Sequence, residues 1–112
     1  MQIKERNMPQ GIILDVVGDL TYANQAVFMA AVEKAKQADC RHLIVNLEQV
    51  RFVDSTGLGL LVLMSQNLKQ LQAQASILKP QRYVREIMSL ANIPELIPIY
   101  ESEEDALTAR AA

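Results

Sequence analysis

Two short apolar runs on either side of an amphipathic segment constrain the fold of this chain more than any other feature. The first run, "GIILDVV" at residues 11–17, is followed by Gly18 and predicts a mostly buried strand that ends in a turn. Residues 22–39 are rich in alanine, glutamine and lysine, and four apolar side chains recur there at helical spacing: Phe28, Ala31, Val32 and Ala35. The second run, "HLIVNL" at residues 42–47, is short enough for another buried strand. A strand, a helix and a strand in this order predict a parallel pair joined by a right-handed crossover.

The segments before and after this unit extend the same alternation. The charged "MQIKER" at residues 1–6 is expected to pair across "NMPQG" as an antiparallel edge strand. A second helix is expected from about Thr56 to Leu71, and its first half is apolar nearly all round, which predicts heavy burial. "QASILK" at residues 74–79 predicts a fourth strand.

The C-terminal third predicts two more helices. Pro80 suits the first position of a helix, because the N–H that proline lacks has no partner inside the helix there. Apolar residues then recur at helical spacing: Val84, Ile87, Met88 and Ala91. "NIPELIP" is expected to stop that helix, since Pro94 and Pro98 block its continuation. Ser102 followed by Asp105 is a capping pattern that predicts a terminal helix.

Strands that alternate with helices over 112 residues predict one α/β domain spanning residues 1–112. We expect a small mixed sheet of four to five strands, mostly parallel with one antiparallel edge. About four helices are expected to pack on one or both of its faces.

Charge and composition narrow the classes of partner. Eleven basic and thirteen acidic residues give a net charge of −2, which offers no concentrated positive field for nucleic acid or anionic lipid. One cysteine forms no internal disulfide, and a single histidine, His42, leaves no metal-binding cluster, so no cofactor is expected. The charged N-terminus does not match a signal peptide, and the longest apolar run is far shorter than a membrane span. These features favour a cytoplasmic protein that binds neither nucleic acid nor membrane.

The most unusual stretch is "FVDSTGLGLLVLM" at residues 52–64, where polar residues precede a run of almost pure hydrocarbon. Ser55 as a catalytic nucleophile would need a base, and His42 is the only imidazole available. The sequence also lacks the glycine that precedes the serine of a nucleophile elbow. We expect His42 to be a partly solvated residue at the start of a strand, and we expect no enzymatic activity.

The two glycines of "GLGLLV" raise the possibility of a phosphate-binding loop, but Val62 stands where a third glycine belongs and no lysine follows. Gly57 and Gly59 disfavour a helix by about 1 kcal/mol each relative to alanine. Close approach to a neighbouring backbone or to a partner surface explains them more simply. Asp54, Ser55 and Thr56 are all good helix caps, although capping alone requires only one of them.

The polar cluster and the strand before it resemble the signature of a known protein family. The order "LIVNLEQVRFVDSTGLGLLV" resembles the signature of the STAS domain, and specifically that of bacterial anti-sigma factor antagonists. "GIILDVVGDL", the Ala-rich helix, "SILKPQRYVREIMSLANI" and "ESEEDAL" stand where that family leads one to expect them, so the resemblance covers nearly the whole chain and implies a STAS-like fold.

The resemblance implies a phosphorylation switch at Ser55. The unmodified antagonist would bind an anti-sigma factor serine kinase and so release a sigma factor, and phosphorylation of Ser55 would end that binding. A PP2C-type phosphatase would reset the switch. The implied partner-binding residues are Thr21, Asp54, Ser55, Thr56 and Gly57, with Thr56 chiefly a cap and a second-choice acceptor.

The chain departs from the family in two places. Thr21 follows "GDL" where antagonists often carry an acid, which affects one expected polar contact to the kinase. "LQAQA" at residues 71–75 replaces the usual glycines before the fourth strand. Leu58, Met29, Met64 and Met88 are interpreted as core residues, and Cys40 as incidental.

Two other readings remain open. The main alternative is a STAS interaction module that is never phosphorylated and serves as a scaffold or as an accessory to a transporter. A serine enzyme ranks third. We expect a monomer, with a weak dimer as the alternative.

Overall fold

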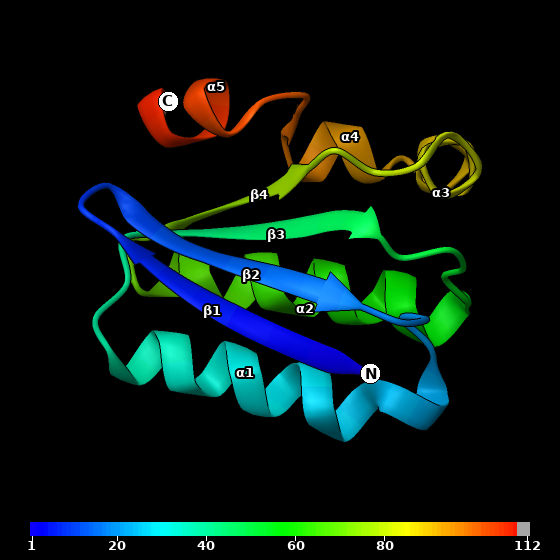
Figure 1. Cartoon of the computed structure of the whole chain (residues 1–112), viewed down its shortest axis with the longest axis horizontal. Helices are drawn as coiled ribbons and strands as arrows, with labels where there is room; N and C mark the ends of the chain where they lie inside the picture. Colours follow the sequence, from blue (N-terminus) through cyan, green and yellow to red (C-terminus); the bar gives the residue numbers. More distant parts are fainter. Residues whose placement is uncertain (110–112) are drawn as a thin grey trace.

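A computed structural model describes residues 1–109 and contains one five-stranded sheet in the order β1-β2-β3-β4-β5 (Figure 1). The strands are β1 Gln2–Met8, β2 Gly11–Val17, β3 His42–Gln49, β4 Gln74–Leu78 and β5 Ile99–Tyr100. β1 is antiparallel to β2, and the other three pairings are parallel. This confirms the mixed, mostly parallel sheet with an antiparallel edge. It also confirms the hairpin between the first two strands.

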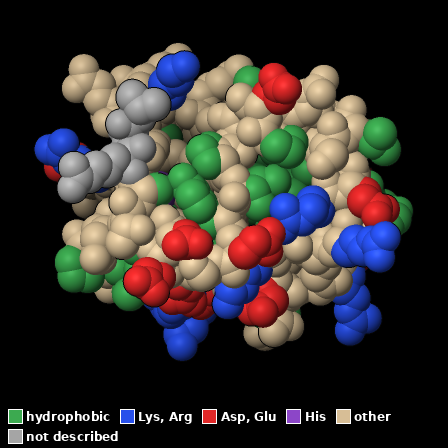
Figure 2. Space-filling model, turned by 90° about the horizontal axis from the view of Figure 1, so that it is seen from above, with side chains coloured by type: hydrophobic (Ala, Val, Ile, Leu, Met, Phe, Trp, Pro, Cys, Tyr) green, Lys and Arg blue, Asp and Glu red, His purple; other side chains and the backbone are tan. Residues whose placement is uncertain are grey.

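Helices cover both faces of the sheet. A 3₁₀ turn, η1 (Tyr22–Asn24), leads into α1 (Gln25–Gln37), and the other helices are α2 Ser55–Gln70, α3 Arg82–Leu90, α4 Ile93–Leu96 and α5 Glu103–Thr108. In Figure 1, α1 and α2 lie side by side beneath the sheet and α5 lies on the opposite side, while α3 and α4 follow β4 and α4 also contacts α2. Figure 2, seen from that opposite side, shows acidic and basic side chains interspersed with hydrophobic ones.

The main core lies between the sheet and the α1–α2 pair. Successive strand residues alternate between faces, so Leu14, Val45 and Ile77 point into this core. α1 and α2 add fully buried side chains: Phe28, Val32, Leu61, Met64 and Leu68. The segment after β4 extends the same core with Val84, Met88, Ile93 and Ile97. A smaller cluster on the other face joins Ile13, Ile44, Leu78 and Ala106 under α5.

The expectations for Pro80 and for the burial of Leu63 were wrong. The expectation for Pro94 was confirmed but incomplete, since α3 ends at Leu90. Pro80 is not the first residue of α3, because the N-cap of that helix is Gln81, whose backbone is extended. The Lys79 N–H donates to the Tyr100 carbonyl at 2.8 Å, so the chain continues along the sheet before the helix begins. Pro94 does not only block a helix; it lies in the first turn of α4, where its missing N–H is tolerated. Leu63 is 44% exposed although it lies in the apolar half of α2.

The parallel order of β2, β3 and β4 determines where the loops gather. Because the carboxyl ends of parallel strands meet at one edge, the β2–α1 and β3–α2 connections are neighbours (Figure 1, right). At the far end of the chain Ser102 accepts a hydrogen bond from the Asp105 N–H at 3.1 Å, which confirms the expected cap of the terminal helix. The edge that carries the two neighbouring connections contains every site residue predicted from the sequence.

Candidate functional site

Asp54 caps α2, and its carboxylate joins two loops. Asp54 Oδ1 accepts a hydrogen bond from the Gly57 N–H at 2.8 Å, and Oδ2 accepts one from the Tyr22 N–H at 3.1 Å. These backbone donors, Gly57 first, hold the pKa of Asp54 below its usual range. Thr56, expected chiefly as a cap, is the second residue of α2 instead. The N-cap needs extended backbone, which Asp54 adopts at φ −94° and ψ −176°.

Ser55 is the first residue of α2 and is exposed. Because Asp54 performs the capping, the hydroxyl of Ser55 is not needed to hold the helix. Thr56, one position further on, is only partly exposed. The structure therefore presents Ser55 more openly than Thr56.

The two loops at this edge are joined by backbone contacts. Leu20 and Val53 form an isolated parallel bridge. The Leu20 N–H donates to the Phe52 carbonyl at 3.0 Å, and the Asp54 N–H donates to the Leu20 carbonyl at 3.3 Å. Thr21 follows immediately and precedes η1. The structure therefore brings Thr21 to the same end of the molecule as Asp54 and Ser55.

Gly57 is required by the close approach of the β2–α1 loop. A Cβ atom added to Gly57 would lie 2.0 Å from the Leu20 carbonyl oxygen. This confirms the expectation of a close backbone approach. Gly59 differs, since a Cβ there would meet nothing within 4 Å.

His42 lies far from Ser55 and is not solvated. It begins β3, while Ser55 follows the other end of that eight-residue strand, roughly 20 Å away. The expectation of partial solvation was wrong: His42 is 2% exposed, its Nε2 lies 2.6 Å from Ser76 Oγ, and burial lowers its pKa. The fold thus keeps the one histidine away from Ser55 and excludes it as a base for that hydroxyl.

Other candidate groups can be placed as well. Burial raises the pKa of the Cys40 thiol, which fits an incidental rather than a reactive cysteine. Within residues 1–109 no group of three or more His, Cys, Asp or Glu side chains is arranged to hold a metal ion. The helices in this part of the chain are all too short or too polar to cross a membrane.

Comparison with known families decides the classification, since the STAS domain model matches residues 1–106. The chain belongs to the STAS domain family. The fold just described is therefore a STAS fold, and the exposed serine at the start of α2 is part of a STAS domain.

The relatives of this STAS domain include anti-sigma factor antagonists. The anti-sigma F factor antagonist of Paenibacillus polymyxa is 24% identical over 96% of this chain and 93% of its own length. The antagonist SpoIIAA has the same fold in its unphosphorylated form, with a TM-score of 0.77 at 19% identity, covering 95% of this chain and 93% of its own. The phosphorylated form of Bacillus SpoIIAA matches with a TM-score of 0.72 at 19% identity, covering 95% of this chain and 96% of its own.

The fold is also found in a protein of another kind. A part of the murine anion transporter Slc26a9 matches with a TM-score of 0.77 and 20% identity, covering 91% of this chain but 18% of the transporter. The fold alone therefore does not decide between a regulator and a transporter module.

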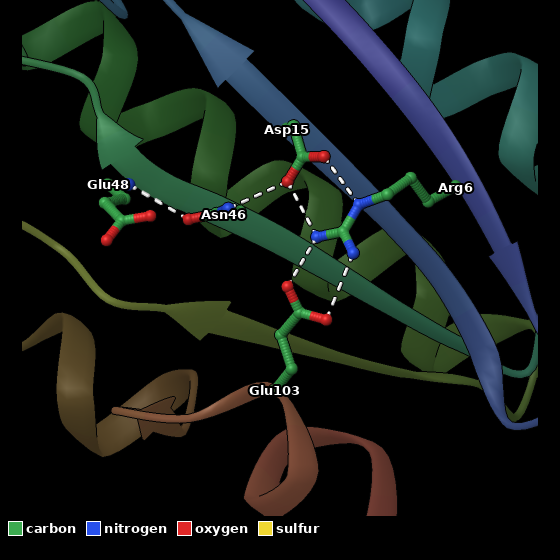
Figure 3. Close-up of polar contacts among 5 residues, drawn as sticks. All are labelled: Arg6, Asp15, Asn46, Glu48 and Glu103. Atoms are coloured by element: carbon green, nitrogen blue, oxygen red, sulfur yellow. Dashed lines mark hydrogen bonds and ion pairs between the residues drawn. The ribbon is translucent and has the colours of Figure 1, made fainter.

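One polar network of this STAS domain could not be inferred from the sequence. Arg6 of β1 forms paired hydrogen bonds with Asp15 of β2, at 2.6 and 3.0 Å, and with Glu103 of α5, at 2.7 and 3.0 Å (Figure 3). Asn46 donates to Asp15 at 2.8 Å and accepts from the Glu48 N–H at 3.0 Å. Its only sequence signal is an acid, Asp15, in an otherwise apolar strand. The network fastens α5 to the sheet.

The charges of this network are mutually stabilised. Glu103, followed by Asp15, raises the pKa of Arg6. The pKa of Glu103 is lowered by its hydrogen bonds with Arg6. Burial alone would raise the pKa of Asp15, but hydrogen bonds from Arg6 and Asn46 lower it below the usual range.

Two exposed aromatic residues beside the cap were also missed. Tyr22 donates its backbone N–H to Asp54, and Phe52 accepts from Leu20, yet both side chains are exposed. The available signal was an aromatic side chain in each of two loops that flank the polar cluster.

Proposed function

We propose that this STAS domain is a cytoplasmic, non-enzymatic anti-sigma factor antagonist that is switched by phosphorylation of Ser55. The unmodified form binds an anti-sigma factor serine kinase and thereby releases a sigma factor. Phosphorylation ends the binding, and a PP2C-type phosphatase restores it. The observation that carries the proposal is the exposed Ser55 hydroxyl at the first position of α2, beside a cap that Asp54 supplies independently.

Electrostatics and solvation favour such a switch at this position. A phosphate on Ser55 adds a charge of about −1.5 to −2 next to ionised Asp54. The positive end of the α2 dipole partly compensates that charge, so the domain stays folded. A partner surface that accepts a small hydroxyl would instead have to desolvate a dianion, at a cost of several kcal/mol. Phosphorylation therefore blocks binding locally, without a change of fold.

The proposed binding residues divide into two groups. Thr21, Asp54, Ser55 and Thr56 are partly or fully exposed at one edge and can contact the kinase directly. Gly57 is buried against the Leu20 carbonyl, so we assign it an indirect role, in which it lets the β2–α1 loop lie against α2. Exposed Gly59 leaves the backbone of α2 open to a partner.

The direct test is incorporation of labelled phosphate when the purified protein is incubated with ATP and a lysate of its own host. Ser55→Ala should abolish the label, and peptide mapping should place it on Ser55. Ser89→Ala is the matched control, because Ser89 is also an exposed helical serine but lies at the end of α3. Thr56→Ala tests the second-choice acceptor and should leave the label in place.

A negative result must be distinguished from an inactive lysate. If a known serine kinase of this class is active in that lysate and Ser55 remains unlabelled, the switch is refuted. An unmodified STAS scaffold or transporter accessory is then the better explanation. Size-exclusion chromatography with light scattering separates the proposed monomer from a weak dimer.

A further inference from the structure

Three apolar side chains are exposed at the same edge as Ser55. Tyr22 is 73% exposed, Val17 46% and Phe52 42%. The chain has only five Phe and Tyr residues, and three of them, Tyr22, Phe52 and Tyr83, are exposed. Two of those three therefore lie in the loops that frame the proposed phosphorylation site. Tyr22 and Phe52 are called the aromatic pair below.

Backbone contacts fix the aromatic pair around the cap. The Tyr22 N–H is held by the Asp54 carboxylate at 3.1 Å, and the Phe52 carbonyl is held by the Leu20 N–H at 3.0 Å. Val53 is buried between Phe52 and Asp54, so in this extended stretch its two neighbours point away from the core. The backbone of both residues is therefore held in place before a partner binds, which leaves only the two side chains to be ordered on binding.

The surface beside Phe52 is concave and of mixed polarity. A hollow of about 430 Å³ is lined by Val17, Gly18, Asp19, Gln49, Arg51 and Phe52. An exposed aromatic side chain at the edge of a hollow, here Phe52, with the charged Asp19 and Arg51 beside it, matches the composition of protein interfaces, in which aromatic anchors supply much of the binding energy.

We propose that Tyr22 and Phe52 are the docking anchors for the anti-sigma factor kinase and that they help to determine which kinase binds. This inference rests on the proposed function, because the kinase must cover the surface around Ser55 in order to phosphorylate it. The matching kinase surface presents apolar pockets beside its contact with Ser55.

The test is the rate of Ser55 labelling by host lysate and ATP, measured at several concentrations of the purified protein. Tyr22→Ala, Phe52→Ala and the double variant should raise the apparent KM, by at least tenfold for the double variant, and leave the maximal rate nearly unchanged. Tyr22→Phe should retain the wild-type KM, since the anchor is the ring rather than the hydroxyl.

Leu71→Ala is the matched control. Leu71 is 57% exposed and follows the last residue of α2, about 24 Å from Ser55 along the helix axis. Its substitution should change the KM by less than twofold. Circular dichroism melts should show that all of these surface variants remain folded.

The other possible results of this labelling experiment would refute either the anchor assignment or the proposed function. A wild-type KM in the double variant overturns the anchor assignment and leaves the Ser55 switch intact. A lower maximal rate with unchanged KM also overturns it, because the pair would then position Ser55 rather than dock the kinase. Absence of label on Ser55 in the wild-type protein, with an active kinase of this class in the lysate, removes the proposed function and the anchors with it.

Discussion

Replacement of Gly57 by alanine should destabilise the domain and disturb the site at the same time. The new Cβ would lie 2.0 Å from the Leu20 carbonyl oxygen and 2.9 Å from both the Leu20 carbonyl carbon and Val53 Cγ1. Leu20 cannot easily yield, because its N–H is bonded to Phe52 and its carbonyl accepts from Asp54. The β2–α1 loop and α2 would have to separate by more than 1 Å.

The size of the effect follows from three contributions. Overpacking against rigid atoms costs about 1–3 kcal/mol, and a broken loop hydrogen bond adds about 1 kcal/mol. The better helix propensity of alanine offsets about 1 kcal/mol. The net loss should be about 1–3 kcal/mol, and for a chain of 112 residues each kcal/mol shifts the Tm by about 4 °C, so the Tm should fall by about 4–12 °C.

Gly59→Ala is the matched control, because it is the same substitution two residues further along α2. A Cβ at Gly59 meets nothing within 4 Å, so only the propensity gain remains, about 0.5–1 kcal/mol or 2–4 °C in Tm. Thermal melts followed by circular dichroism and urea unfolding at 25 °C measure both variants. If Gly57→Ala were as stable as wild type, or if both substitutions had the same sign, the close-approach argument would be refuted.

Other consequences concern the polar network, acid stability and the acceptor. Arg6→Ala should lower the free energy of unfolding, measured with urea, by about 1–2 kcal/mol, which is modest because the network is partly solvated. Arg6→Lys should not restore this stability, since lysine cannot form the two paired contacts. The pKa values of Asp15 and Glu103 are lowered in the folded state, so both carboxylates stabilise the fold fully above a pH of about 4. This stabilisation is lost as the pH falls through the lowered pKa values, and the urea midpoint of the wild-type protein should drop over that pH range. In Arg6→Ala the urea midpoint should drop by a smaller amount. Burial lowers the pKa of His42, so His42 binds a proton more readily in the unfolded chain than in the folded one. The free energy of unfolding should therefore also decline below a pH of about 6.5. His42→Gln removes the titrating group and should abolish this part of the pH dependence. Ser55→Asp should leave the free energy of unfolding within about 0.5 kcal/mol of wild type while it reduces kinase binding in a pull-down with the purified kinase.

The elements that could be predicted from sequence are those whose signal is local. β2 and β3 are apolar runs of strand length, and α1 and α2 repeat apolar residues at helical spacing, so their type and order follow from the chain itself. β5 has two residues and exists only because it pairs with β4, through bonds such as the Ile77 N–H to the Pro98 carbonyl at 2.9 Å. No local sequence pattern predicts a strand of this kind.

The candidate site also combines features that are visible in the local sequence with contacts between distant parts of the chain. The acceptor is predicted by the motif around Ser55, but the second contact of the Asp54 carboxylate, with the Tyr22 N–H, joins residues that are 32 positions apart in the chain. Arg6 and Glu103 are 97 residues apart, so their pairing becomes visible only when β1 and α5 meet on one face. The sequence therefore predicts the proposed acceptor, Ser55, while the supporting contacts required the fold.

The position of Ser55 suits the proposed phosphorylation, because a phosphate there would alter binding without destabilising the domain. Buried side chains such as Leu61 and Met64 anchor α2, and Asp54 caps it, so no stabilising contact of the helix depends on the Ser55 hydroxyl. One residue later, Thr56 is only partly exposed, so a phosphate there would be less fully solvated than one on Ser55. A phosphate on Ser55 changes only the charge and bulk of an exposed surface. Under the proposed function the domain would therefore alternate between two binding states of a single folded structure, which is the property that a reversible switch requires.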